Sequence, residues 1–201
     1  GDTKANLILT DPPYGVSFKS ASGLTIQNDS MKNEEFYTFL LSSFQRMAEH
    51  LEKGGSAYVF HADTEGLNFR KAFINAGFHL AGCCIWVKDS LVLGRSDYQW
   101  QHEPVLYGFM QNGKHHWYSD RKQTTIWHFD KPKRNANPPT SKPLDLLGSP
   151  PLIRNPHARI QLILMLLYTV DILLIYSIRF FSWNQGINSL TVATFVRICF
   201  K

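Results

Sequence analysis

An acid, two prolines and an aromatic residue follow one another as Asp11, Pro12, Pro13 and Tyr14. The carboxylate of Asp11 can accept one hydrogen bond from an exocyclic amino group, and the carbonyl of Pro12, held by the proline that follows it, can accept the other. These two acceptors turn the lone pair of the amine toward an electrophile. Tyr14 adds a flat face on which an unstacked nucleobase can rest. The four residues therefore predict chemistry on the amino group of a base. The alternative is a chance match in a loop with no catalytic role.

The residues just before this motif must position it. Residues 6–10 read Asn-Leu-Ile-Leu-Thr, which has the length and composition of a buried strand. The prolines that follow prevent the strand from continuing, because they lack the donor that a β-ladder needs. The motif therefore lies at the carboxyl end of a strand, which is the edge of an open α/β sheet where ligands bind.

The next 100 residues alternate between helical and strand patterns. Residues 15–33 read as a loop, and apolar residues then recur at helical spacing from Glu34 to Glu52. Further along we expect a strand at Ser56–His61, a short helix at Glu65–Ala76, and strands at Phe78–Val87 and Pro104–Met110. This alternation predicts an α/β fold with a parallel sheet. The last two strands, joined without a helix, are expected to pair antiparallel.

Composition limits the class of protein. The chain has 201 residues, of which 44% are hydrophobic and 13% aromatic, which suits one domain with a sizeable core and excludes a disordered protein. The net charge of +5 is compatible with a polyanionic partner. Cys83, Cys84 and Cys199 lack the spacing of metal ligands, so we expect no metal site. The adjacent pair lies in an apolar run, which fits reduced thiols and a cytoplasmic location. No cationic and apolar leader precedes the first strand.

Two segments combine basic and aromatic residues, as surfaces that contact bases and phosphates do. The first lies between the last two predicted strands and offers Lys88, Arg95, Tyr98 and Trp100. The second, residues 111–134, holds most of the clustered positive charge, including Arg121, Lys122, Lys133 and Arg134. We interpret both as DNA-binding, and the alternative for the second is an ordinary solvated hairpin.

Four motifs occur in one order along the chain. Asp-Pro-Pro-Tyr is followed by Gly-Gly-x-x-Tyr-Val from Gly54, by Trp-Val-Lys from Trp86, and by Gly-Arg-x-Asp-Tyr-x-Trp-x-His-Glu-Pro from Gly94. Together they resemble the beta-group N6-adenine and N4-cytosine DNA amino-methyltransferases of bacteria and phages. The resemblance covers roughly residues 5–155.

The resemblance implies a Rossmann-like, S-adenosylmethionine-dependent methyltransferase sheet, circularly ordered so that the catalytic half comes first. It implies methyl transfer to the exocyclic amine of a flipped base, with Asp11, Pro12, Pro13 and Tyr14 as the catalytic residues. Asp at the first position favours adenine N6, since cytosine enzymes more often carry serine there. The implied partner is double-stranded DNA, read by a segment within residues 86–134, with no membrane and with a homodimer as one option. RNA or protein amino-methyltransferases are a weaker alternative, because they tend to carry Asn-Pro-Pro-Tyr.

Residues 137–143, Asn-Pro-Pro-Thr-Ser-Lys-Pro, are similar to motif X of the same family, usually His-Pro-Thr-x-Lys-Pro, which touches the methionine end of the cofactor. Thr140 offers a hydroxyl and Lys142 a positive charge for a carboxylate. The residues expected at the cofactor are therefore Asp11, Thr140, Lys142 and the later Gly186. A proline-rich linker is the alternative for this stretch.

The remainder, residues 156–201, departs from the family, so we expect the cofactor-binding half to be incomplete. The family carries a Phe-x-Gly-x-Gly loop between two acid-ended strands, and here only Gly186 survives as a glycine of that loop. Three interpretations remain open: a transmembrane helix over Leu162–Ile178, a divergent strand and helix, or a frameshifted gene. The frameshift is suggested because one back-translation of residues 175–180 reads Leu-Phe-Asp-Ser-Phe in a neighbouring frame. An inactive remnant that binds DNA without catalysis is accordingly the alternative function.

Overall fold

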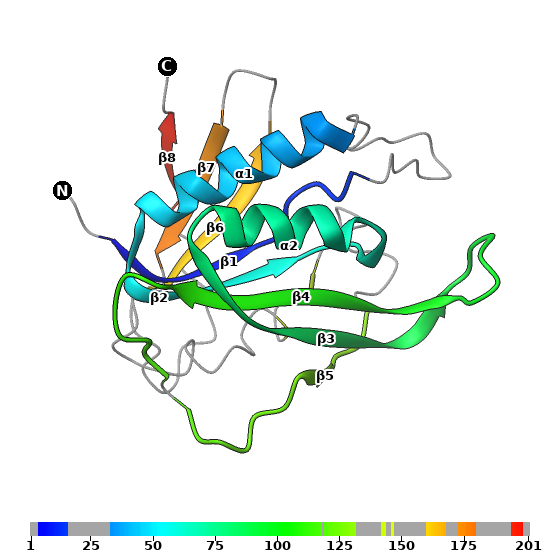
Figure 1. The fold of residues 1–201 in the computed structure, drawn as a ribbon. Coiled ribbons are helices and arrows are strands. Elements are labelled where there is room, and N and C mark those ends of the chain that lie inside the picture. The colour runs from blue at the N-terminus through cyan, green and yellow to red at the C-terminus, as the bar shows by residue number, and fades with distance from the viewer. Residues whose placement is uncertain are drawn as a thin grey trace.

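The structure is a computed structural model that describes residues 4–15, 33–117, 119–131, 142, 143 and 146, and the backbone of residues 160–167, 173–179 and 194–198. In these parts the chain is a mixed α/β protein in which helices pack on a single sheet (Figure 1). The helices are α1 (Asn33–Glu49), the short 3₁₀ turn η1 (Asp63–Glu65) and α2 (Gly66–Asn75).

The described strands join in the order β5-β3-β4-β2-β1-β6-β7-β8. Their bounds are β1 Ala5–Thr10, β2 Leu51–Phe60, β3 Phe78–Val92, β4 Trp100–Met110, β5 Ile126–His128, β6 Ile160–Leu167, β7 Leu173–Arg179 and β8 Thr194–Ile198.

The parallel pairing and the antiparallel last pair that the sequence predicts are both present, and β4 has β2 as a second neighbour. β1 and β2 are parallel, and β3 and β4 are antiparallel. However, β4 lies between β2 and β3, because its residues 105–109 also pair antiparallel with β2. The amino-terminal end of β4 therefore lies at the same edge as the carboxyl ends of β1, β2 and β3. This reversed strand delivers its first residues to the edge where the motif at Asp11 begins.

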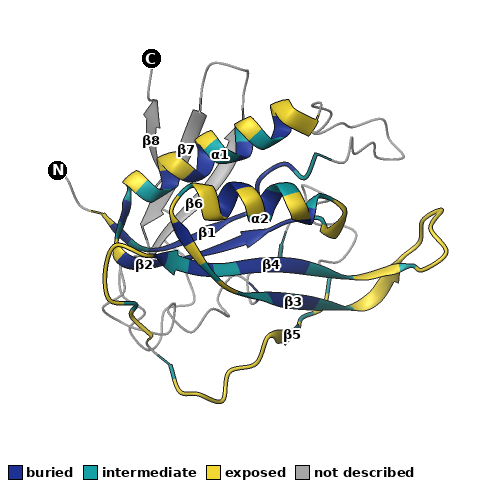
Figure 2. Cartoon of the chain, viewed as in Figure 1, coloured by how far each residue is buried: buried dark blue, intermediate teal, exposed yellow. Residues whose placement is uncertain are grey.

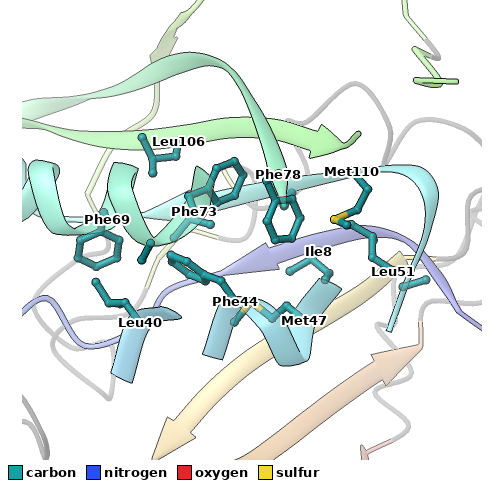
Figure 3. Packing of buried hydrophobic residues seen from close by; sticks show 14 of the residues in the cluster. Ile8, Leu40, Phe44, Met47, Leu51, Phe69, Phe73, Phe78, Leu106 and Met110 are labelled. Atoms are coloured by element: carbon teal, nitrogen blue, oxygen red, sulfur yellow. The ribbon is translucent and has the colours of Figure 1, made fainter. Parts of the chain in front are cut away.

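Helices α1 and α2 cover one face of the sheet (Figure 1). Ile8, Val59 and Leu106 point to this face from three strands, and phenylalanines of both helices pack on them (Figure 3). Phe44 and Phe73 meet edge to face with ring centroids 5.9 Å apart. Each fully buried side chain of this size contributes about 1.5–3 kcal/mol through removal of apolar surface from water. This core fixes where β1 and β2 end.

The opposite face carries the alternate residues of the same strands, including Leu9, Tyr58 and Trp86. The segment after β4 covers it. The indole Nε1 of Trp86 donates to the carbonyl of Phe129 (2.8 Å), and the amide of Ile85 donates to the carbonyl of Thr125 (2.7 Å). Side chains two residues apart on a strand point to the same face. Asp11 is two residues after Leu9, Lys88 is two after Trp86, and Glu103 is two before Val105, so these three charged residues also lie on this face.

The three C-terminal strands settle one of the open interpretations. β6 pairs parallel with β1, whereas β7 and β8 each pair antiparallel with the strand before them. A continuous helix over Leu162–Ile178 is therefore wrong, because most of that stretch is β-strand. Within the described part of the chain, no helix is long and apolar enough to cross a membrane. Gly186 lies outside the described residues.

Candidate active site

The chain turns sharply at the end of β1. Pro12 and Pro13 are buried, and Gly15 adopts a φ of +73°, which side chains with a Cβ rarely adopt. A Cβ at position 15 would lie 2.8 Å from the ring of Phe36, so the turn is also packed against α1. The corner that carries Asp11 and Tyr14 is thus held by two rigid residues before the glycine and by the helix beyond it.

Both carboxylate oxygens of Asp11 accept hydrogen bonds. Tyr14 Oη donates to Oδ1 at 2.7 Å, and Lys142 Nζ donates to Oδ2 at 2.9 Å. The side chain of Asp11 is 27% exposed and that of Lys142 is 8% exposed. Lys142 therefore brings a nearly buried positive charge from a point 131 residues further along the chain.

Glu103 on β4 contacts the same two donors. Its carboxylate lies 3.2 Å from Lys142 Nζ and 3.0 Å from Tyr14 Oη. A third donor, Lys88 on β3, binds it at 2.7 Å with a side chain that is only 9% exposed. The site is consequently a cluster of two carboxylates, two ammonium groups and one phenol. We call Asp11, Tyr14, Lys88, Glu103 and Lys142 the charged cluster.

Aromatic rings surround the ammonium of Lys142. The centroids of Phe60, Tyr14 and Trp86 lie 5.3, 5.4 and 6.0 Å from Nζ. Lys88 Nζ lies 4.9 Å from the ring of Trp86. Rings at these distances attract a cation and exclude water from its other sides, so the carboxylates are the strongest partners that these lysines have.

The charges shift the acidities within the cluster. Burial alone would raise the pKa of Glu103, but Lys142 and Lys88 outweigh it and hold that pKa below its usual value. Burial would lower the pKa of Lys142, and Asp11 and Glu103 instead raise it. The pKa of Tyr14 is well above its usual value because of burial and the two neighbouring carboxylates. At neutral pH the cluster therefore holds paired charges and a protonated tyrosine that donates.

The structure brings together Asp11, Pro12, Pro13, Tyr14 and Lys142 from the predicted site. It places Lys88 differently: the sequence suggested a DNA contact, whereas its ammonium is buried against Glu103 and Trp86 and is not available to a phosphate on the surface. The strand β3 continues past Lys88 to Val92, which carries the residue into the sheet. Thr140, Lys133 and Arg134 lie outside the described residues, as does Gly186.

The other predicted DNA-binding residues are exposed and lie away from the cluster. Arg95, Tyr98 and Trp100 are at the far end of the β3–β4 hairpin, which extends beyond the end of β2 (Figure 2). We call residues 91–100 the hairpin arm. Tyr98 is 92% exposed and Leu93 is 85% exposed. Arg121 and Lys122 are exposed in the segment between β4 and β5.

Sequence reasoning missed Glu103 as a member of the site. The sequence places Glu103 in the loop between the last two predicted strands, among residues expected to contact DNA. Extending each of these strands by one residue would put Lys88 and Glu103 on the face of Trp86 and Val105, because residues two apart on a strand share a face.

Cys83 and Cys84 are not reactive thiolates, and the described residues form no metal site. Burial raises the pKa of Cys84 to about 12 and also raises that of Cys83, so both thiols stay protonated. Among the residues that the structure describes, no group of three His, Cys, Asp or Glu side chains is arranged to hold a metal ion.

With this geometry in place, comparison with known proteins identifies the family. The family model described as DNA methylase matches residues 5–148. The chain belongs to this DNA methylase family. The matched range contains the whole of the charged cluster.

Two solved structures share the fold. The crystal structure of the M1.HpyAVI-SAM complex superposes with a TM-score of 0.55 at 19% identity, covering 82% of this chain and 73% of that one. The crystal structure of M1.HpyAVI gives the same TM-score and identity and covers 82% and 71%. The first of these holds S-adenosylmethionine, the cofactor that the motifs led us to expect. No curated protein sequence matches the chain.

Proposed function

We propose that this DNA methylase transfers a methyl group from S-adenosylmethionine to the exocyclic amino group of a base lifted out of double-stranded DNA, with N6 of adenine as the target. The observation that carries the proposal is the Asp11 carboxylate, which lies at a strand end and already accepts hydrogen bonds from an ammonium and a hydroxyl group. An aminopurine presents the same kind of donor. A carboxylate at this place can orient such a donor without forming any covalent bond to the protein.

The chemistry follows from the acceptors at the corner. Asp11 would accept one hydrogen of the target amine and the Pro12 carbonyl the other, which leaves the nitrogen lone pair facing the methyl donor. S-adenosylmethionine would supply an electrophilic methyl group. The methyl–sulfur bond would break as the new C–N bond forms, which releases S-adenosylhomocysteine, and the positively charged nitrogen would then lose one proton to Asp11. Tyr14 remains protonated because of its raised pKa, so it donates and does not compete for this proton.

DNA would be held by the hairpin arm and the exposed basic residues. Tyr98 and Trp100 offer rings for stacking, and Arg95, Arg121 and Lys122 offer charges to phosphates. The arm is tied to the segment after β5, since the backbone amide of Lys131 donates to Asp89 (2.8 Å) and its ammonium to the carbonyl of Leu91 (3.0 Å). Lys133 and Arg134, which follow directly in the sequence, extend the same basic run.

The cofactor would be held by Thr140 and Lys142, with Asp11 nearby and Gly186 in the later loop. Lys142 is suited to a carboxylate, since it already binds two of them. The expected setting is the cytoplasm of a bacterium or phage-infected cell, as part of a restriction-modification system, and a homodimer is compatible with it.

Replacing Asp11 by alanine is the first test. Tritiated methyl transfer to DNA from a host without DNA methyltransferases should fall by at least about 100-fold, because the residue that orients the amine is lost. DNA affinity should stay within about 3-fold of the wild type, since phosphate and arm contacts remain. Asp63→Ala is the matched control: Asp63 is an exposed carboxylate just after the neighbouring parallel strand, and its loss should leave the rate unchanged.

Mass spectrometry of the digested DNA distinguishes the products. N6-methyladenine supports adenine as the target, whereas N4-methylcytosine would show that the same methyl transfer takes place on cytosine. Methylation by the Asp11→Ala variant at the wild-type rate would remove Asp11 from the mechanism.

The alternative of an inactive remnant gains no support from the family or the structural comparisons. Calorimetric titration with S-adenosylmethionine separates it from an enzyme, because a remnant without a cofactor site gives no heat of binding. Sequencing of the locus tests the frameshift, which requires a motif-like peptide in an alternative reading frame after codon 174.

A further inference from the structure

The acceptor that the target amine needs is already in use. Oδ1 of Asp11 accepts a hydrogen bond from Tyr14 Oη, and Oδ2 accepts one from Lys142 Nζ. Each oxygen keeps a second lone pair, but an incoming amino group has to share Asp11 with a hydroxyl and an ammonium that lie less than 3 Å from its oxygens. The charged ammonium is the stronger competitor for the carboxylate.

Lys142 is the donor that resembles the substrate. Its ammonium is a nitrogen with hydrogens, bound to the catalytic carboxylate and surrounded by the rings of Tyr14, Phe60 and Trp86. An exocyclic amine on a planar base needs the same carboxylate and the same kind of apolar walls. The lysine thus occupies one side of Asp11 that an amine could take, and Asp11 would bind the amine more strongly once the lysine has moved away.

Glu103 offers Lys142 another place without leaving the site. Lys142 Nζ is 2.9 Å from Asp11 and 3.2 Å from Glu103, so a small movement transfers it from one carboxylate to the other. Tyr14 Oη is shared in the same way, at 2.7 and 3.0 Å. Moving a nearly buried ammonium into apolar surroundings would cost much free energy. Because Glu103 can bind the ammonium, Lys142 can leave Asp11 without losing its ion pair.

Lys88 keeps Glu103 in place for this role. It binds Glu103 at 2.7 Å from the side of β3, and its ammonium is itself held over Trp86. The charges alternate from Lys88 to Glu103, Lys142 and Asp11. When Lys142 moves to Glu103, that carboxylate has an ammonium on either side, while Asp11 becomes free to accept the amine.

We propose that Glu103 is a positioning residue that takes Lys142 from Asp11 when the target amine arrives, so that methyl transfer requires an exchange of this lysine between the two carboxylates. The proposal rests on the proposed function for its trigger, but the exchange itself is a property of the protein. It assigns a role to a side chain that touches neither the methyl donor nor the base.

The kinetic test uses Glu103→Gln and the double variant Glu103→Gln, Lys142→Met at saturating cofactor. Without the charge of Glu103, Lys142 stays on Asp11, and kcat should fall by about 10-fold or more while KM for DNA changes by less than about 3-fold. Removing the lysine as well should raise kcat by about 5-fold or more over the single variant, because Asp11 is no longer occupied. Glu103→Asp, which keeps the charge, should recover part of the loss.

A merely structural role for Glu103 predicts a different pattern. The double variant would then be no faster than Glu103→Gln, and that result would overturn the proposal. An unchanged kcat in Glu103→Gln would also overturn it, since it would mean that Glu103 is not needed to draw Lys142 away from Asp11.

A second measurement does not depend on activity. The coupling between Glu103 and Lys142 is measured by urea unfolding of Glu103→Gln, Lys142→Met and the double variant, in the wild-type chain and again with Asp11→Asn. With Asp11 neutral, Lys142 should bind Glu103 alone. The coupling between Glu103 and Lys142 should then change the unfolding equilibrium constant by about 5-fold or more, and it should be larger than the coupling in the wild-type chain. The exposed pair Arg46 and Glu49 serves as the control and should show less than about 2-fold.

The two measurements separate the failure of each idea. If the wild-type chain transfers no methyl group, the proposed function fails, while the unfolding cycle still decides whether Glu103 receives Lys142. If coupling disappears in the Asp11→Asn background, the exchange is refuted even when the chain is an active enzyme.

Discussion

Two parts of the β3–β4 hairpin carry similar side chains in opposite surroundings. In the part that joins the charged cluster, which we call the base of the arm, Lys88 and Glu103 are nearly buried and bind each other, with Trp86 beside them. At its far end, Arg95, Tyr98 and Trp100 are exposed (Figure 2). Only a few residues separate the two groups on each strand.

The difference comes from what lies next to each part of the hairpin. At the base, the residues around Trp127 and Phe129 cover the sheet, and Tyr14 and Lys142 contact Glu103, so side chains lose contact with water. The pairing of β2 with β4 ends at Phe60 and Val105, and among the described residues no other strand pairs with the arm. A charge at the base must therefore find a partner within the protein, whereas a charge or ring in the arm is left for a partner outside it.

The largest expected effect at the buried end concerns His61, which follows β2 and is fully buried. Burial lowers its pKa from 6.5 to about 4. Between these values the unfolded chain binds more protons than the folded one, so the free energy of unfolding falls as the pH drops from 6.5 to 4, by up to about 3 kcal/mol. Above pH 6.5 this contribution is fully present.

Urea unfolding of the wild type and of His61→Gln between pH 4 and 7.5 measures this contribution as the difference between the two curves. His128→Gln, which removes an exposed histidine of β5, should leave the wild-type curve unchanged. Parallel curves for the wild type and His61→Gln would mean that His61 is accessible to protons in the folded state.

The next effect concerns the charge balance of the cluster. Lys142→Met keeps an unbranched apolar stem but leaves Asp11 without its ammonium and Glu103 with Lys88 alone. Because both carboxylates are mostly buried, we expect the free energy of unfolding to fall by about 2 kcal/mol. Arg46→Met, which breaks the exposed pair with Glu49, should cost no more than about 0.5 kcal/mol. Equal losses in both variants would contradict the contrast between the buried base and the exposed surface.

The smallest effect concerns the hairpin arm. Tyr98→Ala should change stability by less than about 0.5 kcal/mol, because the ring is exposed. It should weaken DNA binding by about 1 kcal/mol or more if the ring stacks on a base. Leu67→Ala is the control, since Leu67 is 80% exposed but lies at the start of α2. Fluorescence anisotropy with labelled duplex DNA provides the measurement, and equal affinities for the wild type and Tyr98→Ala would exclude the arm from the interface.

The sequence was most informative where local pattern determines position. The apolar run before Asp11 and its two prolines place the carboxylate at a strand end, and the structure has β1 end at Thr10. The helix predicted from Glu34 to Glu52 is α1, although it stops at Glu49 because β2 begins at Leu51 and pairs with Ala5. Gly54 and Gly55, a residue type that often ends a helix, lie inside that strand.

The charged cluster was harder to predict because its members come from distant parts of the chain. Lys142 and Asp11 are 131 residues apart, and no periodicity joins them. The strand predicted at Phe78–Val87 stops one residue before Lys88, whereas β3 continues to Val92 with its last residues exposed. An exposed strand end has no buried face to mark it in the sequence. What places these residues is the position of β4 between β2 and β3, which is a property of the whole sheet.

The register of β3 on β4 also separates two tasks within one hairpin. Trp86 opposite Glu103, and Val87 opposite His102, fix the base, while the pairing shifts before Val92 meets Trp100. An insertion or exchange of residues beyond that shift would lengthen or replace the arm without displacing the carboxylate that holds the lysines. The arm can therefore be exchanged for the corresponding segment of another member of the family while the charged cluster stays unaltered.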